Sequence, residues 1–311
     1  YLPGYTHVQR AQPVLLAHHL MAHAWAFTRD IDRLIHTIKR ADVSPLGAGA
    51  LAGSSLPLDP DFTAREMGFA DRFANSLDAV SDRDFVAEAL FDLALIGTHL
   101  SRIGEEWVLW TSEEFGFATL DDRYATGSSM LPQKKNADIA ELARGKAGRL
   151  IGNLTGLLTT LKGLPLAYNR DLQEDKEPLF DSYDQVSLAV GALTGMIQTA
   201  TFNADRMRAA ADVQSLSATD LAEYLVRKGT PFRQAHAIVG ALVQEALSGS
   251  QSLLQLVAAS PEFDTDAQAL IGAGVGVQLR SSPGAAGPLA ADDQRARFAS
   301  AIASLRTSLA I

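Results

Sequence analysis

The sequence predicts an all-α protein, with a central bundle of long helices followed by a smaller helical domain. Two observations predict this class. Apolar residues recur at helical spacing over several long stretches, and no convincing run of alternating polar and apolar residues marks a β-strand. No internal repeat of fixed period is present. Helices of such length are typical of a bundle.

Composition narrows the class of protein. The 311 residues suffice for about two domains, and we expect a bundle domain over 1–205 and a small C-terminal domain over 206–311. The net charge of −9 argues against nucleic acid or an anionic membrane as the main partner. The absence of cysteine removes disulfides and thiolate metal sites, and it fits a reducing, cytoplasmic location.

The first long helix is predicted to run from Pro13 to a point before Pro45, since proline is favoured in a first helical turn. The stretch 45–62 is punctuated by glycine and proline and predicts an irregular excursion between helices. A second unbroken helical pattern runs from Asp82 to Trp110 and carries one apolar face.

Residues 111–137 show no periodicity, and a loop of this length inside a compact protein is more often functional than idle. The helical pattern resumes at Asp138. Four glycines then fall on one stripe of the helix: Gly145, Gly148, Gly152 and Gly156. Each glycine costs a helix up to about 1 kcal/mol relative to alanine. The stripe therefore predicts that another helix packs very closely against it.

Another long helix is predicted from Phe180 to Phe202. The uncharged stretch 185–204 carries too many polar side chains for a membrane span, so a buried helix of the bundle is the better interpretation. The C-terminal domain is predicted to contain shorter helices with these boundary signals: a cap at Ser217 or Thr219, an end at Gly229, a helix from Pro231 to Leu247, a loop over 279–293, and a last helix to Leu309.

Three polar islands interrupt the apolar helices. They comprise residues 4–13, 127–141 and 167–178, and we expect each at a helix boundary, where free backbone N–H groups make binding possible. Taken singly, each island is explained as well by helix capping as by a function.

The second island is the most informative of the three. The N–H groups of the turn at 127–129 are able to surround an anion, while Lys134 and Asn136 lie just before a helix N-terminus that adds its dipole. This pattern is typical of a carboxylate or phosphate receptor, and also of a solvated loop. His7 in the first island is open to the same two interpretations, because a histidine needs a positioned carboxylate to act as a proton carrier.

Longer motifs carry a family resemblance. The segment "GSSMLPQKKNADIAELARGK" resembles the signature of the fumarase and aspartase superfamily, and "LAYNRDLQEDKEPLFD" and "GYTHVQRAQPV" resemble its argininosuccinate lyase branch. The resemblance implies a helical bundle shared within a homotetramer, active sites that collect segments from three subunits, and no metal or organic cofactor. It also implies the reversible cleavage of argininosuccinate into arginine and fumarate, a step of arginine biosynthesis.

The resemblance assigns roles to residues of the three islands. Ser128 is implied as the base that removes the succinyl proton, and Lys134 as the cation that favours the serine oxyanion, since a serine hydroxyl is too weak an acid to ionise unaided. His7 serves the acid step and Glu141 polarises it. The implied substrate-binding residues are Thr6, Asn136, Tyr168, Gln173 and Lys176. No metal ligand is implied, and Gln133 and Lys135 are expected to shape the loop.

The sequence departs from the family pattern at its front. Family members carry an N-terminal domain and a first bundle helix ahead of the position of Tyr1, so we expect an N-terminally truncated chain that has little or no lyase activity by itself. Within the motifs, Ala137 stands where the family usually has proline. Pro60 stands where an arginine is often found, which removes one candidate cation.

Two alternative functions remain open at this point. One is another lyase for a succinyl substrate, such as adenylosuccinate lyase, although "QKKN" and "YNRDLQEDK" argue against it. The other is a truncated or structural homologue without catalysis. The expected N-terminal truncation favours that interpretation, and retention of the implied catalytic residues opposes it.

Overall fold

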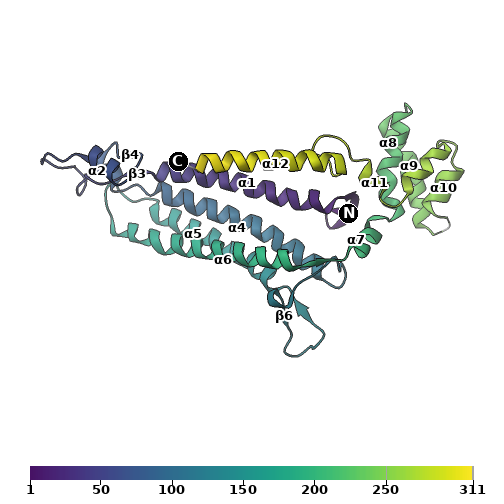
Figure 1. Ribbon diagram of the computed structural model, residues 1–311, viewed down its shortest axis with the longest axis horizontal. Helices are drawn as coiled ribbons and strands as arrows, with labels where there is room; N and C mark the ends of the chain where they lie inside the picture. The colour runs from purple at the N-terminus through teal and green to yellow at the C-terminus, as the bar shows by residue number, and fades with distance from the viewer. Residues whose placement is uncertain (250, 310–311) are drawn as a thin grey trace. The chain divides into compact units, whose positions relative to one another are not determined.

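The computed structural model describes residues 1–249 and 251–309. Helices make up most of these residues (Figure 1), which confirms the predicted all-α class. None of the described helices combines the length and the apolar character that a bilayer crossing requires. The uncharged stretch that begins at Gln185 accordingly belongs to helix α6 (Lys176–Thr199) of the bundle.

The described residues divide into two compact units. The C-terminal unit combines Tyr1–Ala24 with Phe202–Ala301, and the bundle unit combines Trp25–Thr201 with the residues from Ile302 onward. The first 24 residues thus group with the C-terminal unit, whereas the sequence assigned them to the bundle. The predicted boundary near residue 205 stays a prediction.

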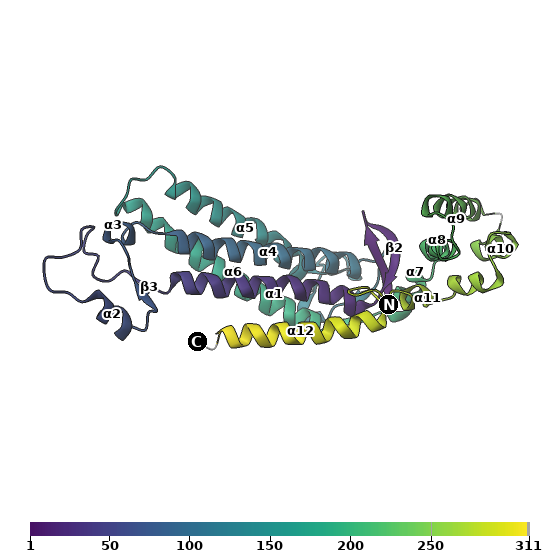
Figure 2. The ribbon, with the colours of Figure 1, turned by 90° about the horizontal axis from the view of Figure 1, so that it is seen from above.

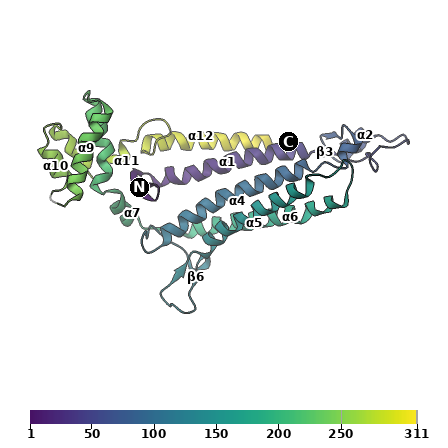
Figure 3. The ribbon, with the colours of Figure 1, turned by 180° about the vertical axis from the view of Figure 1, so that it is seen from behind.

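Long helices dominate the bundle unit: the later part of α1 (Leu16–Ala41), α4 (Asp84–Thr111), α5 (Asp138–Leu161) and α6. Helices α4, α5 and α6 pack against one another in pairs and lie side by side in two views (Figures 2 and 3). The shorter elements of this unit are β3 (Val43–Ser44), α2 (Pro60–Glu66), β4 (Asp71–Arg72), α3 (Ser76–Ala79), β5 (Ala118–Thr119), the 3-10 helix η1 (Asp122–Tyr124), β6 (Thr126–Gly127), β7 (Lys135–Asn136) and the 3-10 helix η2 (Arg170–Asp175).

Glycine residues of α4 let α5 approach closely. A Cβ atom at Gly104 would overlap the carbonyl oxygen of Ala140, and one at Gly97 would overlap the side chain of Leu150. The four glycines of the α5 stripe, in contrast, have no described atom from elsewhere in the chain within 4 Å of the position that a Cβ would take. The expectation that this stripe packs against another helix is therefore wrong for a single copy of the chain.

Buried polar groups link α1 to α4. The Thr37 Oγ1 hydroxyl donates to Asp92 Oδ2 at 2.7 Å, and Nδ1 of His99 lies 2.6 Å from Asp30 Oδ2. Both carboxylates are buried. A slip of one helix along the other would leave these groups without partners, and an unpaired buried polar group costs free energy. The two links therefore help to set the register between the helices.

The C-terminal unit has its own hydrophobic core. Its elements are β1 (Leu2–Thr6), β2 (Gln9–Val14), α7 (Ala204–Ala211), the 3-10 helix η3 (Gln214–Ser217), α8 (Ala218–Arg227), α9 (Phe232–Leu247), α10 (Leu253–Ala259), the 3-10 helix η4 (Thr265–Ile271), α11 (Val275–Gln278) and the first part of α12 (Pro288–Leu309). Strand β8 (Thr201–Phe202) lies at the unit boundary. Leu221, Val239 and Val257 from three different helices meet in the core. Arg280 pairs with the fully buried Asp220 of α8.

Several local predictions need correction. Strands β1 and β2 pair in antiparallel fashion where no strand was expected, because their burial follows no simple alternation. Pro13 lies in β2, and the helix begins only at Leu16. Ser217 occupies the N-cap position of α8 without a side-chain capping bond. Gly229 takes a φ of 98° directly after that helix, in agreement with its predicted role as a stop.

Replacing Gly104 by alanine should destabilise the bundle. The added methyl group meets a backbone carbonyl that cannot rotate away, so the expected cost is about 1–3 kcal/mol in the free energy of unfolding. Chemical denaturation of Gly104→Ala measures it. Gly240→Ala is the matched control, since this helical glycine of α9 has open space around it and should gain up to about 1 kcal/mol. Equal stability changes in the two variants would contradict the packing described above.

Replacing Asp92 by asparagine should stabilise the protein at neutral pH. Burial raises the pKa of Asp92, against the hydrogen bond from Thr37. A raised folded-state pKa means that folding favours the protonated carboxyl group, so its contribution is fully present below the unfolded pKa and is lost as pH rises through the folded pKa. Asparagine keeps an acceptor for Thr37 without the charge.

Thermal unfolding of Asp92→Asn should therefore show a higher midpoint near neutral pH and a shrinking gain in acid. The control is Asp205→Asn, which alters an exposed carboxylate and should change little at either pH. A gain that grows in acid would contradict the sign of the shift.

Candidate active site

The first island forms the tip of the β1–β2 hairpin rather than a helix boundary. Thr6 and His7 are both exposed there. His7 and Val8 have positive φ angles of 55° and 59°, a turn geometry that favours asparagine and glycine. For other residues this left-handed conformation costs about 1–2 kcal/mol each. The tight β1–β2 turn accounts for both angles, and the role of His7 stays a prediction.

The second island is also a hairpin, which projects from the bundle unit beside the label β6 in Figure 1. Strands β6 and β7 pair in antiparallel fashion, with Thr126 opposite Asn136 and Gly127 opposite Lys135. The backbone N–H of Ser128 donates to the carbonyl of Lys134 at 3.2 Å and closes the loop. The hairpin thus brings three predicted site residues, Ser128, Lys134 and Asn136, into one short loop.

The hydroxyl oxygen of Ser128 sits in a nest of backbone donors. The N–H groups of Met130 and Leu131 donate to its Oγ atom at 3.2 and 3.0 Å. Hydrogen bonds to the charged form of a group favour that form. The same two donors would therefore stabilise an alkoxide at Ser128. A serine base needs such stabilisation, because its hydroxyl is too weak an acid to ionise unaided.

Ionic contacts hold this loop against its surroundings. The Nζ atom of Lys135 lies 2.7 Å from Asp122 Oδ1 and also donates to the carbonyl oxygen of Leu120. At the other end, the Thr126 hydroxyl donates to Asp138, in the first turn of α5. These contacts agree with the loop-shaping role expected for Lys135.

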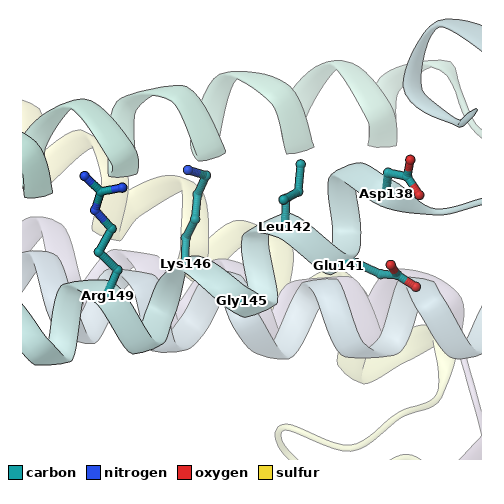
Figure 4. A pocket seen from close by; sticks show the side chains of 6 residues that line it. All are labelled: Asp138, Glu141, Leu142, Gly145, Lys146 and Arg149. Carbon is teal, nitrogen blue, oxygen red and sulfur yellow. The ribbon is translucent and has the colours of Figure 1, made fainter.

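A groove of about 430 Å³ runs along α5 from the second island (Figure 4). Its lining residues are Asp138, Glu141, Leu142, Gly145, Lys146 and Arg149. The two acidic side chains lie at the end that begins the helix, and the two basic ones lie farther along. The basic side chains already have partners on α6, since Arg149 pairs with Asp181 and Lys146 donates to Gln185. Glu141 is exposed.

The third island joins α5 to α6 through η2. Ala167 has a φ of 68°, and this strained residue directly precedes Tyr168. The amide of Gln173 donates to the phenol oxygen of Tyr168 at 2.5 Å. Lys176 begins α6 and donates to Asp175 at 2.8 Å. The three predicted substrate-binding residues of this island therefore lie close together in the chain's own fold.

Two residues of this neighbourhood were missed in the sequence. Asp175 is buried, and its second carboxylate oxygen accepts from Nε of Arg83 at 2.6 Å. Asp175 stands within the third island, so its position was visible as a candidate. Arg83 lies 92 residues away along the chain, and no local pattern marks a lone arginine as a partner of that island.

The second and third islands do not meet within one copy of the chain. Ser128, Lys134 and Asn136 of the second island precede the first residue of α5, the third island follows its last, and α5 has 24 residues. At about 1.5 Å per residue the two ends of this helix are about 36 Å apart. Figure 1 shows the β6 hairpin and the α5–α6 connection at opposite ends of these helices. Thr6 and His7 belong to the other compact unit.

Comparison with known proteins adds evidence of a different kind. Residues 1–152 match a family described as "Lyase", and residues 215–273 match "Argininosuccinate lyase C-terminal". A protein of Moorella thermoacetica named argininosuccinate lyase is 54% identical over 99% of this chain and 68% of its own length. The chain belongs to the argininosuccinate lyase family. Proteins of the same name from Frankia casuarinae and Acidothermus cellulolyticus are 57% and 56% identical, and the chain spans 63% of each.

Solved structures share the fold of this argininosuccinate lyase family member. An EDDS lyase variant with bound fumarate superposes with a TM-score of 0.88 at 31% identity, over 99% of this chain and 65% of that one. A 3-carboxy-cis,cis-muconate lactonizing enzyme from Pseudomonas putida reaches 0.74 at 21% identity. At that identity the likeness concerns the fold alone. The resemblance stated from the three sequence motifs is thus confirmed at the level of the family.

Proposed function

We propose that the intact protein acts as a carbon–nitrogen lyase that cleaves argininosuccinate reversibly into arginine and fumarate. The observation that carries this proposal is the environment of the Ser128 hydroxyl. Its oxygen accepts hydrogen bonds from two backbone N–H groups, in the loop that also contains Lys134. Sequence identity of 54–57% to the three argininosuccinate lyases named above supports the choice of substrate.

The proposed reaction passes through an intermediate with additional negative charge, which the site must stabilise. Ser128, as its alkoxide, takes a proton from the succinyl carbon beside a carboxylate, and the electron pair left on that carbon forms a dianionic aci-carboxylate. Fixed donors and cations aimed at developing charge are commonly the largest catalytic contribution. Lys134, Asn136 and Thr6 are proposed to hold the succinyl carboxylates. The bundle's α5 begins just after Asn136, so its N-terminal dipole adds to the same field.

The second half of the reaction breaks the bond between carbon and nitrogen. The leaving guanidino nitrogen receives a proton from His7, directly or through water, and Glu141 polarises that histidine. Tyr168, Gln173 and Lys176 are proposed to bind the amino-acid end of the substrate. No step of this scheme transfers electrons to a cofactor, because the proton and the electron pair both stay with the substrate fragments and the protein.

One copy of the chain is proposed to be inactive by itself. The second and third islands lie about 36 Å apart along α5, which is much farther than one argininosuccinate molecule reaches. A complete site then needs segments from more than one copy, and we propose a homotetramer with shared active sites. The first island, with His7, is proposed to come from a different copy from the one that supplies Ser128.

The surface of the long helices supports assembly. The glycine stripe of α5 is exposed and open in a single copy. Large apolar side chains of α5 and α6 are also exposed: Leu142, Ile151, Leu158, Phe180, Tyr183 and Leu188. Helices with apolar side chains on several faces are typical of buried positions, so these exposed side chains support the proposal that the helices meet another copy.

Replacing Ser128 by alanine tests the proposed function. The variant should lose at least about a hundredfold in kcat, the usual contribution of a positioned base, because alanine has no group that takes the succinyl proton. Fumarate release from argininosuccinate, followed by its ultraviolet absorbance, is the measurement. Substrate binding and assembly should stay nearly unchanged.

The matched control is Ser129→Ala, which alters the neighbouring hydroxyl and should retain most of the activity. Unchanged turnover in Ser128→Ala would remove Ser128 from the mechanism. If the wild-type protein cleaves adenylosuccinate and not argininosuccinate, the proposed substrate is wrong.

Replacing Gly152 by leucine tests the proposed assembly. The large side chain should block close packing on the α5 stripe, so the protein should sediment as a smaller species and lose activity with it. Leucine has the higher helix propensity, which keeps the helix itself intact. Gly240→Leu on α9 is the control, since this glycine too has open space around it. Tetramers and full activity in Gly152→Leu would contradict the use of the stripe as an interface.

A further inference from the structure

Asp175 occupies an N-cap position that it does not use for capping. It directly precedes α6, yet its side chain accepts no hydrogen bond from the first turn of that helix. Aspartate at this position usually accepts from a backbone N–H two or three residues ahead. Here the carboxylate turns instead to two cations, one on each oxygen. Helix capping therefore does not explain the residue.

The two cations differ in their surroundings. Arg83 donates through Nε to Asp175 Oδ2 at 2.6 Å, and its side chain is 17% exposed. Its NH1 group also donates to the backbone carbonyl of Asp82 at 2.7 Å, just ahead of α4. Lys176 donates to Oδ1 at 2.8 Å, and its side chain is 51% exposed. The carboxylate thus connects a fixed, mostly buried cation to one that reaches solvent.

The position of Lys176 is electrostatically unfavourable without this carboxylate. Lys176 is the first residue of α6, and a cation at a helix N-terminus is repelled by the positive end of the dipole. Asp175 offsets that repulsion. With Arg83, the group of three has a net charge of +1, so Asp175 does not neutralise both cations.

We infer that Asp175 is a positioning residue for substrate binding: anchored by Arg83, it holds the Lys176 ammonium toward the carboxylate of the arginine half of the substrate. The inference rests on the proposed function. An ammonium group has three donors, and Asp175 occupies one of them. The other two remain for a substrate carboxylate. Tyr168 and Gln173, joined by their own hydrogen bond, belong to the same connection between α5 and α6.

The ionisation of Asp175 agrees with this role. Burial acts to raise its pKa, but hydrogen bonds from Lys176 and Arg83 outweigh burial, and the pKa is lowered. The carboxylate therefore stays charged across the neutral range, and its hold on Lys176 persists there.

The test compares Asp175→Asn with the wild-type protein in its native assembly. We expect KM for argininosuccinate and Kd for arginine to rise about tenfold or more, the effect of losing one well-placed charge-assisted hydrogen bond. The inhibition constant of fumarate should stay within about twofold, because the proposed fumarate contacts lie in other islands. If Asp175 only stabilised the fold, its replacement would lower the amount of active enzyme and hence the apparent kcat. The KM for argininosuccinate and the inhibition constant of fumarate would then both stay near their wild-type values.

Two further variants keep the inference open to refutation. Arg83→Gln leaves Lys176 and Asp175 in place without their anchor, and should raise KM in the same direction but less; it decides the matter if Asp175→Asn does not fold. Asp264→Asn is the matched control, since Asp264 holds a lysine, Lys228, in the C-terminal unit, and its KM should equal that of the wild type.

The possible failures are distinguishable. A wild-type protein that neither binds arginine nor cleaves argininosuccinate overturns the proposed function and the inference with it. An active wild-type protein whose Asp175→Asn and Arg83→Gln variants keep the wild-type KM and Kd overturns the inference alone.

Discussion

The rigidity of one long helix governs the rest of the structure. Because α5 is an unbroken helix of 24 residues, it holds the Ser128 loop and the Tyr168 connection about 36 Å apart. No rotation of a side chain or loop closes that distance. The predicted site residues of the second and third islands therefore lie at the two ends of the helix, with an exposed glycine stripe between them. The proposed sharing of active sites is the arrangement that such a helix makes possible.

Glycine has two different uses in this bundle. On α4, Gly97 and Gly104 face α5 inside one copy, where a Cβ would overlap existing atoms. On α5, the glycine stripe faces away from the described chain. Both sets of glycines recur at helical spacing, so the sequence alone does not distinguish glycines that contact a helix of the same copy from glycines that face outward. The difference matters, because internal glycines govern the stability of one copy, whereas the proposed use of the external ones governs assembly.

Most basic side chains near the islands of this acidic protein form ion pairs with nearby carboxylates, as Lys135 does with Asp122 and Arg149 with Asp181. Such pairs orient loops and helices but leave little free positive charge. The group of Arg83, Asp175 and Lys176 differs, since two cations share one carboxylate. In this group Arg83 is mostly buried, whereas Lys176 is half exposed.

Local periodicity and contiguous motifs were enough to predict the helical class, the approximate extent of α4, the start of α5 and the family. The sequence also identified the three islands and the residues within them. Three findings needed the folded chain: the first island is a tight hairpin, the α5 stripe is open, and Arg83 reaches Asp175 across 92 residues. Those facts depend on which elements pack together, and neither hydrophobic period nor residue spacing encodes the partner of an individual side chain.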